Sequence, residues 1–429
     1  MTKKKAFRAL VLCLPAFYAG PASPALEAAQ VPFEQAMVDL ASPDAGVRLR
    51  TVEMLKDAAY PEAAMPLAKL VLDPRDDVQL AAIAAEINIF LAEKIVSHRR
   101  VGLVVEVRTP VAADAVFDMG PLAVGPRPVP TELLDALRTA ARDDNPRVRL
   151  EAVYAFGVLA VEPGGNRRRE LLRASGPDLA AMTSADDPSH RYSALRVLGR
   201  VFERRLQDDP IEQYVGDTVI SALNGEGKAM QSAAMQALGA MRYPRAVQGL
   251  MDLFQYYGKG HMAAEALDGL ARIGHPSSVP LLVSQLSSKN GELRGIAIEG
   301  LARAGDRGRL ADIQSALSGE RSDSLQLAGR FAAAMLSGAG LDPLVEALAK
   351  SKLRDQARWY LMEAAPGRTE TFVRHLQDPD PARRMDLVDA LGLSGDGAAL
   401  ALVRPMASDP DVRVARAVAR ALARLGQVK

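Results

Sequence analysis

The sequence predicts an all-α solenoid of about ten to eleven helix-turn-helix repeats. Three observations predict this class: a composition rich in helix formers, a helical pattern that returns at a regular interval, and acidic proline turns between its copies. Of the 429 residues, 48% are hydrophobic and 5% are aromatic. Ala, Leu and Arg favour helices, whereas strand-rich proteins depend on aromatic and β-branched residues.

The helical pattern is apolar-Arg-x-x-Ala-x-x-Ala-Leu-Gly, as in "VRLEAVYAFGVLA" from Val148 and "VARAVARALARLG" from Val414. From Met230 onward, its copies begin 32, 31, 32, 28, 30 and 31 residues apart. Such a period is typical of a solenoid, because one helix pair can bury its apolar face only against its neighbours. The copies begin at Val47, Val78, Val148, His190, Met230, Met262, Leu293, Leu325, Leu353, Arg383 and Val414.

The connections between copies are predicted to be turns that start the next helix. In Asp378-Pro379-Asp380 and Asp144-Asn145-Pro146, Pro sets the turn and Asp or Asn caps the helix. Ala and Gly at the eighth and tenth positions would let neighbouring helices approach closely. A final Gly, as at Gly274, Gly305 and Gly426, suits a left-handed helix cap.

These copies resemble HEAT repeats, specifically the short bacterial type also found in phycobilin-lyase-like proteins. The resemblance covers about Phe33 to Leu425 and implies a HEAT/armadillo-like superhelix. It also implies that a turn Asp pairs with an Arg at the second position of the inner helix in a neighbouring copy. That position is occupied by Arg48, Arg149, Arg191, Arg294, Arg354 and Arg384.

Two regions interrupt the period. Val78 and Val148 lie 70 residues apart, and residues 97–130 are assigned to a non-repeat insertion. In it, "VGLVVEVRT" could form a strand, and "GPLAVGPRPVP" is too rich in Pro and Gly for a helix. Two later steps, of 42 and 40 residues, are assigned to lengthened connections at 162–176 and 200–217.

The predicted organisation follows from these interruptions. A signal peptide occupies residues 1–25, and N-terminal repeats occupy 26–96. The insertion follows at 97–130, and a second solenoid region at 131–429 ends in a capping helix.

The signal peptide is predicted from four basic residues within the first eight positions, followed by the uncharged stretch Ala9–Gly20 and by small residues. Cleavage is expected near Ala25, and an ordinary N-terminal apolar helix stays open as the alternative. Cleavage would reduce the basic residues from 53 to 49 against 52 acidic ones, leaving a charge of −3. The sequence thus predicts an exported protein, periplasmic or extracellular, with no transmembrane span after cleavage.

Cys13 is the only cysteine and lies within this segment. Val11 and Leu12 precede it, whereas a lipidated cysteine follows small residues, so a lipid anchor is not expected. The cleaved chain would contain no cysteine, which excludes disulfides, a thiol nucleophile and a cysteine-based zinc site.

No catalytic constellation is recognised in the sequence. No two of the five histidines are three or four residues apart, so no helix presents a histidine pair to a metal. The sequence contains neither a Gly-x-Ser-x-Gly motif nor a phosphate-binding P-loop. We therefore predict no catalytic residue, no metal ligand and no cofactor.

The seventh position of each inner helix points away from the seam, and the eleventh follows one turn later. Both are predicted to line the concave face, although each residue could also be a solvated or core position. Mixed charge with a few aromatics suits a protein or peptide better than a phosphate backbone. The candidates for partner binding are Tyr154, Arg196, Arg200, Gln236, Asp268, Arg272, Glu299, Arg303, Phe331, Trp359 and Asp389.

The function predicted from these features is that of an exported, non-enzymatic HEAT-repeat scaffold with a protein or peptide partner. One alternative is a lyase-like or chromophore-handling protein, which the resemblance implies; predicted export and the lack of Cys or paired His weigh against it. The second alternative is a nucleic-acid-binding solenoid, and the slightly negative cleaved chain weighs against nucleic acid.

Overall fold

The computed structural model describes residues 33–91, 112–125, 127–160, 165–203, 211–225 and 227–426. Helices are the regular elements of these ranges, apart from one isolated antiparallel bridge between Leu91 and Val124. The predicted all-α class is therefore confirmed. The predicted signal peptide and the predicted strand at 101–109 lie outside the described residues. Nowhere in the described ranges does a helix combine the length and apolarity that crossing a membrane requires.

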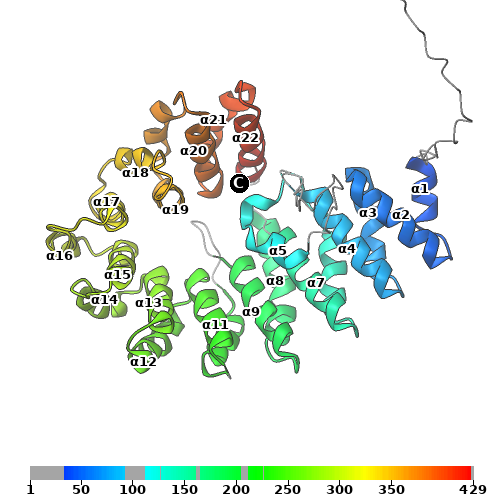
Figure 1. The fold of residues 1–429 in the computed structure, drawn as a ribbon, viewed down its shortest axis with the longest axis horizontal. Coiled ribbons are helices and arrows are strands. Elements are labelled where there is room, and N and C mark those ends of the chain that lie inside the picture. Colours follow the sequence, from blue (N-terminus) through cyan, green and yellow to red (C-terminus); the bar gives the residue numbers. More distant parts are fainter. Residues whose placement is uncertain are drawn as a thin grey trace, which may run out of the picture.

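The helices form two layers of a curved stack, in which outer and inner helices alternate along the chain (Figure 1). The inner helices are α2 (Ala45–Ala58), α4 (Asp76–Phe90), α7 (Pro146–Leu159), α9 (Pro188–Val201), α11 (Lys228–Ala240), α13 (His261–Ile273), α15 (Gly291–Ala304), α17 (Asp323–Ser337), α19 (Arg354–Ala364), α20 (Pro381–Leu393) and α22 (Val412–Leu425). The outer helices are α1 (Phe33–Asp39), α3 (Ala64–Leu70), α6 (Thr131–Ala140), α8 (Gly165–Met182), α10 (Gln213–Ser221), α12 (Val247–Tyr257), α14 (Val279–Gln285), α16 (Leu310–Ala316), α18 (Asp342–Ala347), the 3-10 helix η7 (Thr369–His375) and α21 (Ala399–Val403).

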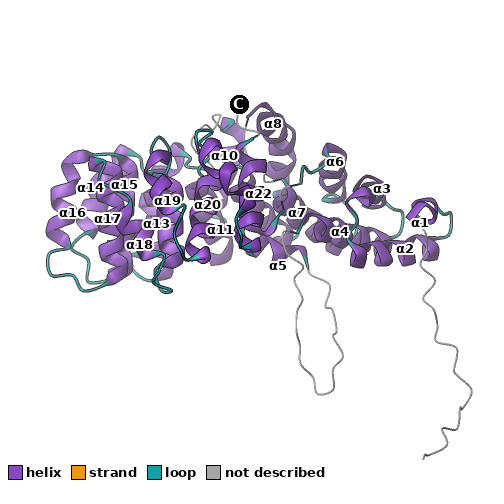
Figure 2. Ribbon diagram, turned by 90° about the horizontal axis from the view of Figure 1, so that it is seen from above, coloured by secondary structure: helices purple, strands orange, loops and turns teal. Residues whose placement is uncertain are grey.

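Each inner helix packs against the inner helix of the next copy and against its own outer helix. The buried apolar side chains consequently form one continuous seam from Ala36 to Leu425. The stack curves so that α20 and α22 turn back toward α5 (Ala113–Asp118), which lies within the predicted insertion (Figure 1). Seen from above, α1 to α4 extend away from the curved part (Figure 2).

The turns cap the inner helices as the sequence predicts. The side chains of Asp44, Asn145 and Asp380 each accept a hydrogen bond from the backbone N–H two residues later. Gly274 and Gly305 adopt the predicted left-handed conformation. Gly426 does not adopt it, since its φ is −67°. The prediction of a left-handed cap at Gly426 was therefore wrong.

The predicted pairing of arginine with turn aspartate holds at both ends of the solenoid. Arg48 donates from Nε and Nη2 to Asp73 at 2.6 and 2.8 Å, and Arg384 contacts Asp409 at 2.8 Å through the same two atoms. A further guanidinium nitrogen of each arginine donates to carbonyl groups of its own turn. These arginines therefore join three segments: one helix, its turn and the following turn.

The other arginines of this set depart from the pattern to different degrees. Arg149 forms the predicted pair with the turn aspartate Asp187, but at 3.9 Å, and Arg294 pairs with Glu320 instead of an aspartate. Arg354 pairs with an aspartate inside the next inner helix. Arg191 donates to the carbonyl groups of its own turn.

Small residues let the inner helices approach closely, as predicted. A Cβ atom placed on Gly300 would lie 2.9 Å from the Cα and Cβ atoms of Ala271. One placed on Gly392 would lie 2.7 Å from the Cβ atom of Ala421. In both cases the near atoms belong to the backbone or to the methyl group of an alanine. They cannot move away unless the whole helix moves.

Replacing Gly300 by Ala is expected to lower the free energy of unfolding by about 1–3 kcal/mol, because overpacking outweighs the gain in helix propensity. Gly291 lies in the same helix, and a Cβ atom there would meet only side-chain atoms, the nearest at 3.8 Å. Urea unfolding should therefore separate Gly300→Ala from a Gly291→Ala control. Equal midpoints for the two variants would contradict the close packing.

The predicted connection at 162–176 was wrong over residues 165–176, and the one predicted at 200–217 extended too far at both ends. Residues 165–176, assigned to a connection, belong to α8, which continues through Pro177 to Met182. In the second region, α9 continues to Val201 and α10 starts at Gln213. The extra residues of the first region therefore lengthen α8, which the sequence period alone does not reveal.

Candidate functional site

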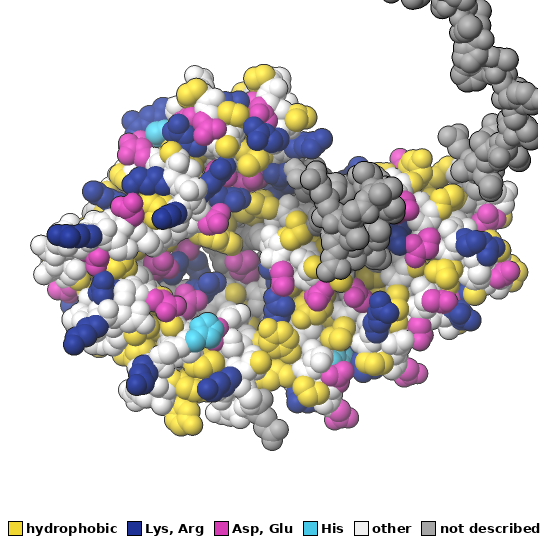
Figure 3. All heavy atoms as spheres, viewed as in Figure 1, with side chains coloured by type: hydrophobic (Ala, Val, Ile, Leu, Met, Phe, Trp, Pro, Cys, Tyr) yellow, Lys and Arg dark blue, Asp and Glu magenta, His cyan; other side chains and the backbone are white. Residues whose placement is uncertain are grey.

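The inside of the curve encloses a cavity of about 770 Å³. Its walls come from α5 and the following turn and from α9, α11, α13, α15, α19 and α20. Figure 3 shows a hollow inside the curve with charged side chains of both signs around it. The predicted site residues that line this cavity are Arg196, Arg200, Gln236, Asp268, Arg272, Trp359 and Asp389.

A second cavity, of about 460 Å³, shares Arg272 and Trp359 with the first. It also includes Glu299 and Arg303, two further predicted residues. The seventh and eleventh positions thus converge on one inner surface.

Arg303 is the centre of a buried ion cluster inside the curve. It donates from Nε and Nη2 to the two carboxylate oxygens of Glu363 on α19, each at 2.8 Å. Its Nη1 lies 3.2 Å from Glu299. Burial alone would raise the pKa of Glu363, but the charge and hydrogen bonds of Arg303, together with the charges of Arg242 and Arg272, outweigh burial and lower it. Arg303 therefore joins α15 to α19 through this ion pair, and its guanidinium is not free to bind a partner.

Phe331 was wrongly predicted to face a partner. It is fully buried on α17, and its ring stacks on Tyr360 of α19 at 4.3 Å between centroids. Tyr360 then donates a hydrogen bond to Glu299 at 2.5 Å. The helix α19 therefore leans inward over α17 and covers the face that Phe331 would otherwise expose.

Asp389 was predicted to be free for a partner, and this prediction was also wrong. Its side chain is only 4% exposed and pairs with Arg420 on α22 at 3.2 Å. Asp389 borders the large cavity, but its charge is already compensated. Trp359 differs from both, because 48% of its surface is exposed at the cavity.

The predicted insertion contributes to the site through Phe117 of α5. The guanidinium of Arg200 lies 4.4 Å and that of Arg196 lies 5.0 Å from the centroid of the Phe117 ring. Tyr154 packs on the same ring at 5.5 Å, and Asp118 pairs with Arg196. Three predicted partner-binding residues are thus engaged by this chain's own insertion.

Truncating Phe117 to Ala is expected to release α5 from α7 and α9, because a buried aromatic anchor contributes about 3–5 kcal/mol. Hydrogen exchange should then accelerate in residues 112–125 and leave α13 to α15 unchanged. A Met119→Ala variant is the matched control, since Met119 is 53% exposed. Unchanged exchange in residues 112–125 of Phe117→Ala would show that Phe117 does not hold the segment.

Ser232, Gln236 and His261 surround Glu265 at the cavity wall. The hydroxyl of Ser232 and the amide of Gln236 each donate to its Oε1 at 2.8 Å, and Nε2 of His261 lies 3.1 Å from the same oxygen. Serine and histidine therefore converge on a carboxylate, an arrangement that orients Glu265.

The structure adds residues that the sequence analysis missed. Phe117, Met119 and Leu122 of the insertion line the cavity. The available signal was an isolated aromatic residue beside an aspartate, just before a Pro- and Gly-rich stretch. Among the described residues, no group of His, Cys, Asp or Glu side chains is arranged to hold a metal ion.

Comparisons with known proteins concern the repeats. Residues 369–429 match the family model of HEAT repeats. No curated protein matches the chain in sequence.

Several solved structures are similar to this chain. An engineered protein is 18% identical with a TM-score of 0.42, over 92% of this chain and 99% of that one. A structure from work on the interaction between cadherin and beta-catenin is 12% identical with a TM-score of 0.41, over 92% and 94%. Importin beta is 16% identical with a TM-score of 0.37, over 92% of this chain and 50% of that one. The chain thus spans about half the length of importin beta.

Proposed function

We propose that this all-α solenoid is a non-enzymatic scaffold that holds a segment of another protein in the 770 Å³ cavity. The observation that carries the proposal is the convergence of six inner-face elements on one hollow with an exposed aromatic residue, Trp359, in its wall. Exposed aromatic side chains in concave sites are frequent anchors for protein partners.

The polar lining also favours a protein segment over the two alternatives. Carboxylates outnumber guanidiniums around the cavity, which disfavours a phosphate backbone. No feature of the described residues favours the lyase-like alternative, and the phycobilin-lyase type remains an untested prediction.

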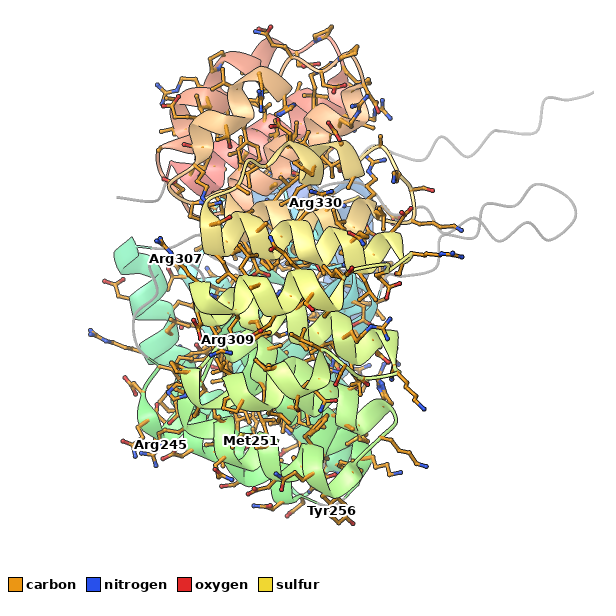
Figure 4. All side chains as sticks on the ribbon, turned by 90° about the vertical axis from the view of Figure 1, so that its left-hand side faces the viewer. Arg245, Met251, Tyr256, Arg307, Arg309 and Arg330 are labelled. Atoms are coloured by element: carbon orange, nitrogen blue, oxygen red, sulfur yellow. The ribbon has the colours of Figure 1, made fainter. Side chains whose placement is uncertain are left out.

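Affinity capture tests the proposal with three forms of the chain. Proteins retained by the wild type should be lost from a Trp359→Ala/Met119→Ala variant, which removes two exposed apolar side chains of the cavity. They should be retained by Tyr256→Ala, because Tyr256 is 80% exposed on the outside of the curve (Figure 4). The proposal would be contradicted if all three forms retained the same proteins, or if none of the forms retained any protein.

Export is a separate part of the proposal, supported by the basic and then uncharged start of the sequence, which lies outside the described residues. N-terminal sequencing of the protein from intact cells should find a chain that begins near Ala25. A chain that retains residues 1–20 would contradict export by cleavage.

A further inference from the structure

The lining of the large cavity is acidic. Seven carboxylates and four guanidiniums contribute to it, so its formal charge is −3 without histidine. The carboxylates belong to Asp118, Glu203, Glu265, Asp268, Glu292, Asp355 and Asp389, and the guanidiniums to Arg196, Arg200, Arg272 and Arg358.

The positive charges of this lining are all engaged within the chain. Arg272 contacts Asp268 at 2.7 Å, and Arg358 lies 3.4 Å from Asp386. Arg196 pairs with Asp118, and Arg200 covers the ring of Phe117. An anionic ligand would have to displace these contacts.

Several carboxylates, in contrast, lack strong compensation. The side chain of Asp355 is 91% exposed, and Arg358 lies 3.8 Å from its carboxylate. Glu292 is exposed and forms no ion pair within the described part of the chain. The side chain of Glu265 is only 10% exposed, and within the described ranges its Oε2 has no hydrogen-bond partner.

Trp359 lies one helical turn after Asp355 on α19, so the two side chains share one helix face. An indole beside a carboxylate suits a guanidinium or ammonium group, because the ring face attracts the cation and the carboxylate pairs with it. Met119 supplies a second exposed apolar contact from the insertion.

We propose that the segment held in the cavity is basic, and that one of its arginine or lysine side chains stacks on Trp359 and pairs with Asp355 or Glu292. This inference rests on the proposed function and specifies the chemistry of the partner. The cavity volume of about 770 Å³ fits an extended chain far better than a lone cation. Its carboxylates are also not gathered into a metal-binding group among the described residues.

Trp359 is the only tryptophan of the chain, so its fluorescence reports on this site alone. The probe is a capped peptide of about nine residues with alternating Arg and Ala, about 30 Å long when extended. A peptide with Glu in place of Arg is its control. We expect the Arg peptide to change Trp359 emission saturably and the Glu peptide to leave it unchanged.

Charge removal then tests the contacts. In an Asp355→Asn/Glu292→Gln variant, the Kd of the Arg peptide should rise roughly fivefold or more, as expected for the loss of two exposed ion pairs. A Glu132→Gln variant should retain the wild-type Kd, since Glu132 is exposed on the outer helix α6.

Three results would overturn the inference: no saturable change with the Arg peptide, equal binding of the Glu peptide, or an unchanged Kd in the double variant. Binding of spermine as tightly as the Arg peptide would also overturn it in favour of a small polycation. If affinity capture still requires Trp359 and Met119, the proposed function stands while the basic partner fails. If neither affinity capture nor peptide binding changes when the cavity residues are replaced, the proposed function and the basic partner are both contradicted.

Discussion

Replacing Arg303 by Met is expected to lower the free energy of unfolding by about 3–5 kcal/mol, because it leaves Glu363 buried without its main partner. Arg303 forms two 2.8 Å hydrogen bonds to this carboxylate and a third contact to Glu299. Arg242, at 3.6 Å, offers only a longer substitute for Glu363. Urea unfolding of the two forms measures the difference.

A double variant separates the cost of an unpaired charge from general damage. Arg303→Met/Glu363→Leu replaces both partners by apolar groups and should recover much of the lost stability. The pKa of Glu363 is lowered by folding, so its stabilisation is present above the unfolded pKa of about 4.3 and is lost as the pH falls through the folded pKa. Equal destabilisation of the single and double variants would show that packing, not charge, explains the effect.

Replacing Glu86 by Leu is expected to raise the free energy of unfolding by about 1–3 kcal/mol at neutral pH. Glu86 is fully buried on α4, and neither of its carboxylate oxygens has a hydrogen-bond partner among the residues that the structure describes. It occupies the ninth position of its copy, where Leu238, Leu270 and Leu301 fill the seam in other copies. A leucine there would restore the pattern and remove the buried carboxylate.

The stabilisation expected from Glu86→Leu should depend on pH, since burial raises the pKa of Glu86 well above its usual range. As the pH rises above about 4.3, the unfolded chain loses this proton before the folded chain does, so the wild type loses stability until the pH reaches the folded pKa. The advantage of Glu86→Leu should therefore grow with pH over that interval. Glu86→Gln, which cannot ionise, should remove the same pH dependence. Parallel pH profiles for wild type and Glu86→Gln would contradict this account.

The repeat period was sufficient to predict the architecture. Caps at Asp44, Asn145 and Asp380 and the close approach at Gly300 follow from local patterns that recur in several copies. The orientation of the inner face was predictable for the same reason, since the position within a helix determines which way a side chain points.

It was harder to predict which individual residues of the inner face are free to contact a partner. Asp389 and Arg420 both occupy the seventh position, in successive inner helices, and such positions are neighbours across the stack. Opposite charges at neighbouring seventh positions therefore pair with each other. Applied to the sequence, this rule would have removed Asp389 from the candidates.

The burial of Phe331 and the partial burial of Tyr154 were hard to predict for a different reason. Their exposure depends on how α19 leans over α17 and on where the insertion places Phe117. Both are tertiary contacts between segments whose relative placement the repeat pattern does not encode.

Photo-cross-linking tests the central claim, that a partner segment occupies the cavity, most directly. A photoreactive phenylalanine analogue at Gln236 would lie in the cavity wall, and one at Tyr256 would lie on the outside of the curve. After irradiation in cells, the Gln236 form should yield a discrete adduct to another protein, and the Tyr256 form should not. The same adduct from both positions, or an adduct from Tyr256 alone, would contradict the account.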